Sequence, residues 1–258
     1  MRKELLALAE QMHVVVSPAL KAMIEAGDYE ALQAMLNNLR EEWRLRYGTR
    51  ARRLAGQWVG AANAESKRRF SEGIKDALGV DFAAIFDGPA ITQAVQVMGT
   101  EAVNLISSIP DQYFQDIQEA VLKNYMGQPL PDGRSLIDQI EETYKVSRER
   151  AALIARDQTS KINTAVTQAR CEELGIETYK WRTVRDIRVV GNPDGLFPKG
   201  SRAHGNHFER EGKRYYWREN PNPEDGIRNP PEDGPPGWAI NCRCTAESVI
   251  DIDKLKFV

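Results

Sequence analysis

The spacing of apolar residues changes near Gly175, and this change constrains the fold more than any other feature of the sequence. From Arg2 to about Gly175, apolar side chains recur at steps of three and four residues, which is the spacing along one face of an α-helix. After Gly175 the chain is rich in aromatic and β-branched residues, glycine and proline, a pattern typical of short strands joined by loops. The sequence therefore predicts an α+β fold, with a mostly helical N-terminal region followed by a small α+β module of few antiparallel strands and long loops.

Capping and stop signals predict the individual helices of the first region. An apolar stripe from Leu32 to Trp43 follows Asp28, which can cap a helix N-terminus. A second stripe begins at Ile91, and we expect it to end at Pro110, because proline interrupts the hydrogen bonds of a helix. A third apolar run, Phe114–Tyr125, reaches Gly127.

Two further helices are predicted before the pattern changes. Ser135, with Asp138 three residues later, resembles a capping box and indicates a short helix through Glu142. A longer helix is expected from about Ser147 to Leu174, where Gly175 can adopt the left-handed conformation that ends a helix.

A turn rich in proline and glycine, Gln128–Gly133, is the best candidate for a joint between two helical parts of the chain. It divides the chain into a helical N-terminal region, 1–131, and an α+β module, 134–258. Strands are predicted within the module at Thr178–Thr183, Lys213–Trp217 and Glu247–Ile250. The segments between them, Val190–Gly205 and Arg218–Gly237, are expected to be irregular loops. Loops of this length in a compact domain are usually functional or disordered.

Composition excludes several classes of protein. The chain is 41% hydrophobic and 28% charged, as in ordinary globular proteins. No apolar run approaches the roughly 20 residues that cross a bilayer, and the first residues do not form a signal peptide, so we expect no membrane partner and a start in a cytoplasm. The net charge of -2 gives no global electrostatic reason to bind nucleic acid.

A series of motifs in the second half resembles the Mu F-like minor head proteins, also called head morphogenesis proteins, of tailed bacteriophages. The likeness covers about half of the chain, from around Ser135 to Val249, and depends on the order and spacing of its elements. These are Ala155-Arg156-Asp157-Gln158 with Asn163, Ala165 and Ala169, then Gly175-Ile176, then Trp181-Arg182-Thr183-Val184-Arg185-Asp186-Ile187-Arg188-Val189, then His207 with Gly212, and finally Ile240-Asn241-Cys242-Arg243-Cys244-Thr245.

The resemblance implies a structural protein of the virion that carries out no reaction. Such a protein docks at the portal or on the inner capsid and assists head assembly or genome delivery. Its implied partners are the phage portal protein and major capsid protein, with phage DNA as a further candidate. Its implied location is inside the head or at its portal, and the host cytoplasm during assembly.

The sequence departs from the family pattern in two places. Asp157-Gln158 stands where the family commonly has Thr-Glu, and Gly191–Gly200 lengthens the segment before the family histidine. The insertion leaves two candidates for that histidine, His204 and His207. We favour His207, because its spacing to Gly212 fits the family better.

His204-x-x-His207 and Cys242-x-Cys244 are candidate metal ligands, because imidazoles and thiolates are the donors of tetrahedral zinc sites. The spacing argues against zinc, since zinc knuckles carry Cys-x-x-Cys rather than Cys-x-Cys. The alternative is a hydrogen-bonded His207 in a small core, with the cysteines as compact buried side chains. From sequence we favour this alternative and expect no cofactor, with zinc left open.

A polar group near the first predicted strand has two interpretations. It consists of Arg182, Asp186, Arg188 and Asn241, together with His207. Asp186 lies among cations and should be ionised, which suits either a general base beside His207 or an ion pair that ties loops to the sheet. We favour the structural interpretation, because no nucleophile or oxyanion element accompanies the group. The chain also lacks a P-loop, a dinucleotide fingerprint and a His-Glu-x-x-His motif, so we expect no enzymatic activity.

A basic stretch in the helical region supports a second functional hypothesis. It contains Arg44, Arg46, Arg50, Arg52 and Arg53, interleaved with the aromatic residues Trp43, Tyr47 and Trp58. Cations and aromatic rings together can grip a phosphate backbone or stack on bases. The alternative function is therefore a nucleic-acid-binding protein, with a zinc-stapled C-terminal module as an optional part. Nearby glutamates favour an ordinary solvated helix face instead.

Overall fold

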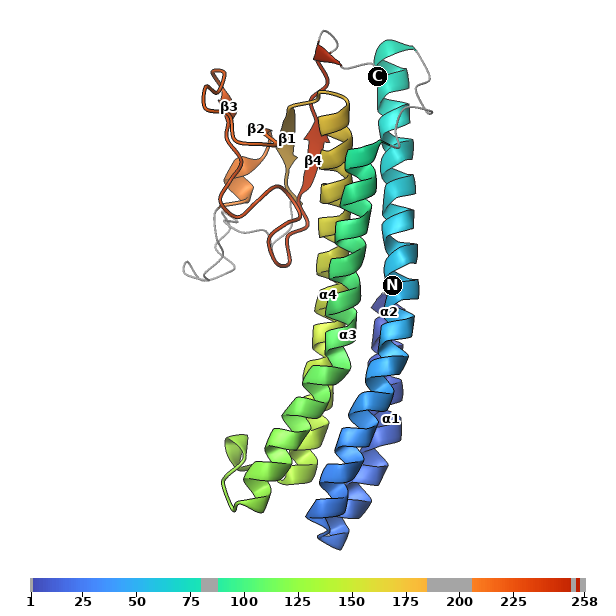
Figure 1. Cartoon of the computed structure of the whole chain (residues 1–258). Coiled ribbons are helices and arrows are strands. Elements are labelled where there is room, and N and C mark those ends of the chain that lie inside the picture. The colour runs from blue at the N-terminus through green and yellow to red at the C-terminus, as the bar shows by residue number, and fades with distance from the viewer. Residues whose placement is uncertain (1, 80–87, 185–205, 252–253, 256–258) are drawn as a thin grey trace. The chain divides into compact units, whose positions relative to one another are not determined.

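The computed structural model describes residues 2–79, 88–184, 206–251 and 254–255. Within these residues the chain forms four long helices followed by a small sheet (Figure 1). The helices are α1 (Arg2–Ala26), α2 (Tyr29–Leu78), α3 (Pro89–Tyr125) and α4 (Leu136–Glu173). The predicted α+β class is confirmed.

Four short strands form one mixed sheet in the order β3-β2-β1-β4. They are β1 (Thr178–Arg182), β2 (Arg214–Tyr216), β3 (Ile227–Arg228) and β4 (Thr245–Ser248). β1 pairs antiparallel with β2 and β4, whereas β2 pairs parallel with β3. β3 lies within Arg218–Gly237, where the sequence indicated no regular structure, and its two residues fit between the prolines of that segment. The strand predicted at Glu247–Ile250 begins and ends slightly earlier in the chain, as β4.

Two helix predictions were wrong. α3 does not end at Pro110, because Ile109, Tyr113 and Phe114 are fully buried and their packing outweighs the hydrogen bond that proline removes. The short helix before Glu142 and the long helix after Ser147 are one continuous helix, α4. No glycine or proline lies between them, so nothing interrupts the backbone ladder.

The predicted helix ends are confirmed by hydrogen bonds. The Ala31 amide donates to the Asp28 carboxylate at 2.9 Å, and the Asp138 amide donates to the Ser135 hydroxyl at 3.1 Å. At the end of α4, Gly175 has a φ of 75°, and the Ile176 amide donates to the carbonyl of residue 171 at 2.7 Å. This is the hydrogen-bond pattern of a left-handed helix stop.

The chain divides into two compact units by contact density. The first unit is 1–58 with 99–156, and the second is 59–98 with 157–258. The turn Gln128–Gly133 lies inside the first unit, between α3 and α4. The two units therefore divide the chain differently from the domains predicted on either side of that turn. The predicted domains 1–131 and 134–258 stay a prediction.

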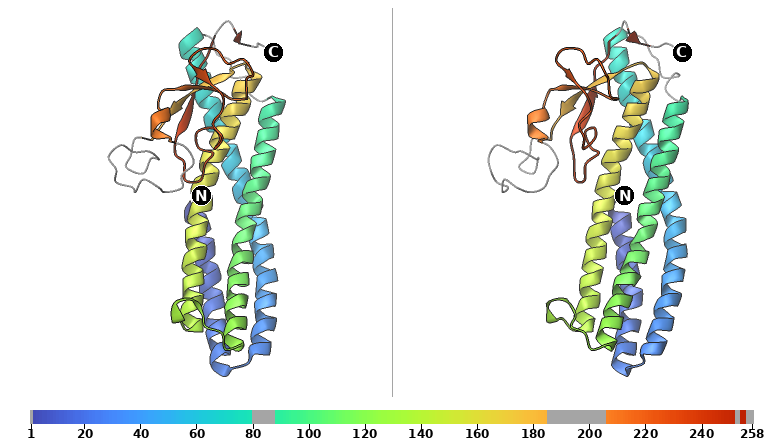
Figure 2. Two further views of the ribbon diagram at one scale, coloured as in Figure 1. Left: turned by 90° about the vertical axis from the view of Figure 1, so that its left-hand side faces the viewer. Right: turned by 60° about the vertical axis from the view of Figure 1, so that its left-hand side comes forward.

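In the first unit, α1 runs alongside the parts of α2, α3 and α4 that belong to it (Figure 1 and Figure 2). Its core consists of apolar side chains that meet at helical spacing, among them Leu5, Met12, Val16, Leu20, Leu32, Leu36, Tyr47, Ile106, Tyr113, Phe114, Ile117 and Ile140. None of the described helices is long and apolar enough to cross a membrane.

In the second unit, the strands lie beside the C-terminal part of α4 (Figure 2). One buried cluster joins helix and sheet: Phe70, Ile74, Cys171, Leu174, Ile176, Tyr179, Trp181, Tyr215, Trp217, Cys242 and Cys244. The sheet is short, so these aromatic side chains and the loops around them supply most of the buried surface of the module.

Candidate metal centre

Three potential metal ligands meet in the second unit. His207, Cys242 and Cys244 are buried, and one donor atom from each lies within 4.8 Å of the others. The Nδ1 atom of His207 is 3.4 Å from the Cys242 sulfur and 3.8 Å from the Cys244 sulfur. The described residues thus contain a His/Cys/Cys group that could hold a metal ion.

The local backbone explains why the Cys-x-Cys spacing works here. The two cysteines immediately precede β4, and residues i and i+2 of an extended chain point to the same side. Before them, Asn241 adopts a φ of 62°, and the Cys242 amide donates to the Ala239 carbonyl at 2.9 Å. This turn reverses the chain so that both sulfurs reach His207.

A buried ion pair supports His207 from the other side of its ring. The Nε2 atom of His207 lies 2.9 Å from one oxygen of Asp233, and the guanidinium of Arg210 donates to the other oxygen at 2.7 Å. Arg210 also lies over the ring of Trp181, 4.8 Å from its centroid, and Trp181 meets His207 edge to face at 5.1 Å. Sequence reasoning missed Asp233 and Arg210, because neither stands in a recognisable motif.

The two thiols titrate unequally because they share a hydrogen bond. That bond raises the pKa of Cys242 to about 12, with burial as a further cause, whereas the bond from Cys242 lowers the pKa of Cys244 to about 7 against the effect of burial. Near neutral pH Cys242 therefore keeps its proton, whereas Cys244 is partly ionised. Cys244 is the thiol already suited to bind a metal as a thiolate.

His207 and Asp233 favour their charged forms in the metal-free chain. Burial opposes protonation of His207, but its hydrogen bonds with Cys242 and Asp233 outweigh burial and raise its pKa. Burial likewise opposes ionisation of Asp233, and the hydrogen bonds from Arg210 and His207 outweigh it and lower its pKa. A bound cation would replace the proton on Nδ1 of His207.

The distances suit either a metal or a hydrogen-bonded cluster. Tetrahedral zinc with bonds of about 2.3 Å to sulfur and about 2.0 Å to nitrogen places a sulfur and a nitrogen ligand roughly 3.5 Å apart. The two sulfur–nitrogen distances bracket that value. Thiol hydrogen bonds to an imidazole also fit them, so the arrangement is compatible with both interpretations made from the sequence.

The other residues predicted for this site are dispersed or lie outside the described residues. Asp186, Arg188 and His204 fall in 185–205, which the structure does not describe. Arg182 follows Trp181 on β1 and therefore points to the opposite side of the strand, away from the thiols. It pairs there with Glu247 on β4 and with Glu211 at 3.5 Å. Asn241 shapes the turn before Cys242, and its backbone N–H donates to the Asp157 carboxylate at 3.3 Å.

The basic stretch on α2 offers cations but no aromatic stacking surface. Arg44, Arg46, Arg50, Arg52 and Arg53 are exposed. Arg44 and Arg46 pair with Glu41 and Glu42, and Arg50 donates to Gln11 at 2.8 Å. The interleaved aromatic residues Trp43, Tyr47 and Trp58 are at most 7% exposed, so they belong to the core and cannot stack on bases.

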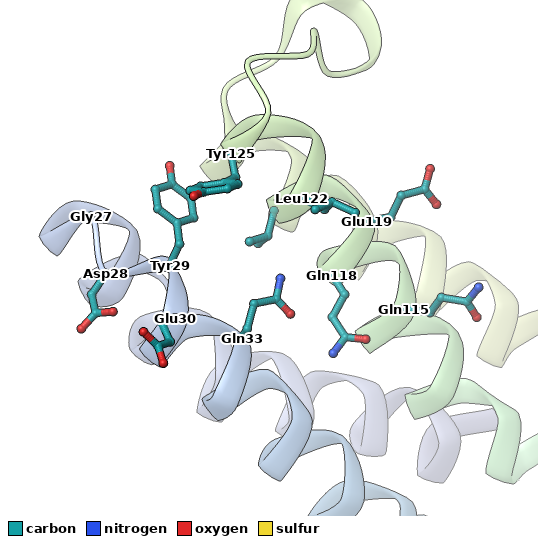
Figure 3. A pocket seen from close by; sticks show the side chains of 11 residues that line it. Gly27, Asp28, Tyr29, Glu30, Gln33, Gln115, Gln118, Glu119, Leu122 and Tyr125 are labelled. Atoms are coloured by element: carbon teal, nitrogen blue, oxygen red, sulfur yellow. The ribbon is translucent and has the colours of Figure 1, made fainter.

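A pocket of about 900 Å³ lies in the first unit, where the turn between α1 and α2 faces the C-terminal part of α3 (Figure 3). The rings of Tyr29 and Tyr125 meet at 5.1 Å on one side of it, and Leu122 is 53% exposed. Gln33, Gln115 and Gln118 add amide groups. No sequence motif indicates this pocket, because it combines residues about ninety positions apart.

Comparisons with known proteins identify no family. No family model and no solved structure matches the chain. Over 205 residues, or 79% of its length, the chain is 32% identical to a protein of Haemophilus influenzae strain Rd that is described as uncharacterized. The match spans 40% of that protein, so the chain corresponds to less than half of this relative.

Proposed function

We propose that the chain is a structural protein of tailed-phage heads, which docks at the portal or on the inner capsid and assists head assembly or genome delivery. The observation that carries this proposal is the meeting of Trp181, His207, Cys242 and Cys244 in one buried cluster. These residues belong to the motif series that resembles the Mu F-like proteins. Although they are spread along the sequence, they lie close together in space, as expected of motif residues that build one module.

The cluster suits a structural role. Its three ligand residues are buried, and the side chains beside His207 are either aromatic, as Trp181 is, or paired with each other, as Arg210 and Asp233 are. We assign the module no reaction and regard it as a scaffold that presents loops to a partner.

We further propose that His207, Cys242 and Cys244 bind a metal ion and that this ion is zinc. Two thiolates and one imidazole match the preference of Zn²⁺ for sulfur and nitrogen, and they would leave one position of a tetrahedron for a further ligand. The ion would join the segment around His207 to the segment before β4. In a module with such short strands, this link contributes directly to folding.

Two exposed surfaces are candidates for docking. Near the cysteines in sequence, Trp238 is 40% and Ile240 is 70% exposed, so two large apolar side chains are accessible to a partner. In the helical unit, the pocket of Figure 3 offers a second apolar contact with amide groups at its rim. A portal or capsid protein with complementary apolar anchors would cover either surface.

Nucleic-acid binding is the less well supported alternative. It required aromatic residues beside the exposed arginines, and Trp43, Tyr47 and Trp58 are buried. The exposed arginines could therefore attract DNA only through their charge. Two of them, Arg44 and Arg46, are already paired with glutamates.

Mass spectrometry of purified phage heads tests the proposal. Heads would be collected after prophage induction from the strain that carries the gene, and compared with heads from a strain with the gene deleted. We expect a few copies of the chain per head, cross-links to the portal protein, and fewer DNA-filled heads after deletion. Heads that lack the chain, together with normal head yield after deletion, would contradict the proposal.

A further inference from the structure

Asp233 is a buried carboxylate that contacts His207 but belongs neither to the sheet nor to the three candidate ligands. Its side chain is 8% exposed, and its two oxygens have different partners, Nε2 of His207 at 2.9 Å and the Arg210 guanidinium at 2.7 Å. A buried carboxylate is costly unless both oxygens are satisfied, and here both are. Asp233 therefore has a defined orientation relative to the imidazole.

This orientation selects one nitrogen of His207 as a metal ligand. A neutral imidazole carries a single N–H, and an ionised carboxylate can only accept a hydrogen bond. When a metal replaces the proton on Nδ1, Nε2 keeps its hydrogen and donates it to Asp233. The lone pair of Nδ1, which faces the two sulfurs, is then available to the ion. Metal-bound histidines commonly donate their second nitrogen to a carboxylate in this way.

We propose that Asp233 and Arg210 are positioning residues of the metal site, and that His207 binds the ion through Nδ1. The proposal rests on the metal site of the proposed function and extends it beyond the three ligands. Arg210 fixes Asp233 and lies on Trp181, whose edge meets the His207 ring. The four side chains form a closed ring of contacts that sets the plane of the imidazole before an ion arrives.

The same contacts connect the metal site to the proline-rich loop. Asp233 belongs to Arg218–Gly237, and near the end of this loop the Gly237 amide donates to the Cys242 sulfur at 3.2 Å. The loop thus supplies a carboxylate that orients one ligand and an amide that bonds to another. Loading the site with metal should therefore order this part of the loop.

Cobalt(II) binding to the full chain tests the positioning role. Co²⁺ bound by thiolates absorbs in the visible and near ultraviolet, and competition with a chelator gives its affinity. We expect Asp233→Asn and Arg210→Gln each to weaken cobalt binding by about 10- to 100-fold while retaining the thiolate-to-cobalt bands. Glu232→Gln is the matched control, because it removes an exposed charge one residue away and should leave the affinity unchanged.

A measurement on the unaltered chain removes any dependence on how the variants fold. Nitrogen-15 NMR of the zinc-loaded chain reports which imidazole nitrogen is bound, with the His207 signal assigned by comparison with His13→Gln and His204→Gln. We expect a protonated Nε2 and a metal-bound Nδ1. Binding through Nε2, or an Asp233→Asn affinity equal to that of Glu232→Gln, would overturn the positioning role alone. Failure of the unaltered chain to bind either metal would overturn the metal site itself, whereas the head-protein proposal is decided separately by the composition of heads.

Discussion

The hydroxyl of Thr164 on α4 donates to the carbonyl of Pro236 at 2.5 Å, which fastens the end of the proline-rich loop to the helix. The next residue, Gly237, has a φ of 86°, and a Cβ there would lie 2.8 Å from the Thr164 hydroxyl and 3.2 Å from the Ser160 carbonyl. Close approach of the loop to α4 therefore requires glycine at this position.

Gly237→Ala should destabilise the second unit by about 1–3 kcal/mol more than Gly226→Ala, because only the first substitution also overpacks the contact with α4. Gly226 has a similar φ of 78° with open space around its Cβ direction, so it controls for backbone strain. Urea unfolding followed by tryptophan fluorescence measures the difference. Equal losses in the two variants would show that the loop does not depend on this contact.

The stability of the first unit should fall as pH decreases from 7 to 5. His13 stacks on Tyr144 at 4.0 Å, and burial lowers its pKa despite the nearby Glu141. Because the unfolded chain then binds more protons than the folded chain, the stability is complete above the ordinary pKa of about 6.5 and is lost as pH falls toward the lower folded value.

The variant His13→Gln should show a smaller loss over the same range. Unfolding in urea at several pH values, followed by circular dichroism, measures it. Below about pH 4.5 both proteins should lose further stability, because the hydrogen bond from Lys21 lowers the pKa of Glu141, whose ionised form is favoured in the fold. Parallel pH profiles between pH 7 and 5 would refute the role of His13.

Removing metal should loosen the second unit selectively. Chelation takes away the link between His207 and the cysteines, so amides in 231–244 should exchange with solvent faster, while those of α1 should keep their protection. Hydrogen exchange read by mass spectrometry resolves the two regions. If chelation left the exchange rates of 231–244 unchanged, the result would argue for the hydrogen-bonded cluster without an ion.

The arginines of α2 should contribute little to folding or to DNA binding. Arg52→Gln combined with Arg53→Gln removes two exposed charges and should change the free energy of unfolding by less than about 0.5 kcal/mol. We also expect binding to double-stranded DNA no tighter than roughly 10⁻⁴ M at physiological salt, measured by fluorescence anisotropy. Micromolar binding that falls steeply with salt, and is lost in this variant, would favour the nucleic-acid hypothesis.

Local signals predicted much of the fold. Asp28, Ser135 and Gly175 mark helix ends through bonds to residues a few positions away, so sequence alone identifies them. Pro110 was misread, because packing of Ile109 and Tyr113 against the rest of the bundle decides whether the helix continues. β3 was missed, because two residues carry no periodicity and acquire their conformation by pairing with β2.

The candidate site was predictable only in its ligands. His207, Cys242 and Cys244 are recognisable as metal-binding residue types, but the choice between a metal and a hydrogen-bonded core depends on distances that the sequence does not contain. Asp233 lies 26 residues from His207 and 23 from Arg210, within a segment whose composition indicates only a loop. Its role depends on how that loop folds back onto the histidine.

Metal analysis of the purified chain tests most directly the claim that the second unit is built around a bound ion. The unaltered chain and a Cys242→Ser, Cys244→Ser double variant would be produced with zinc present, dialysed, and measured by inductively coupled plasma mass spectrometry. We predict close to one equivalent of zinc in the unaltered chain and almost none in the variant. A well-folded unaltered chain with no more zinc than the variant would contradict the claim.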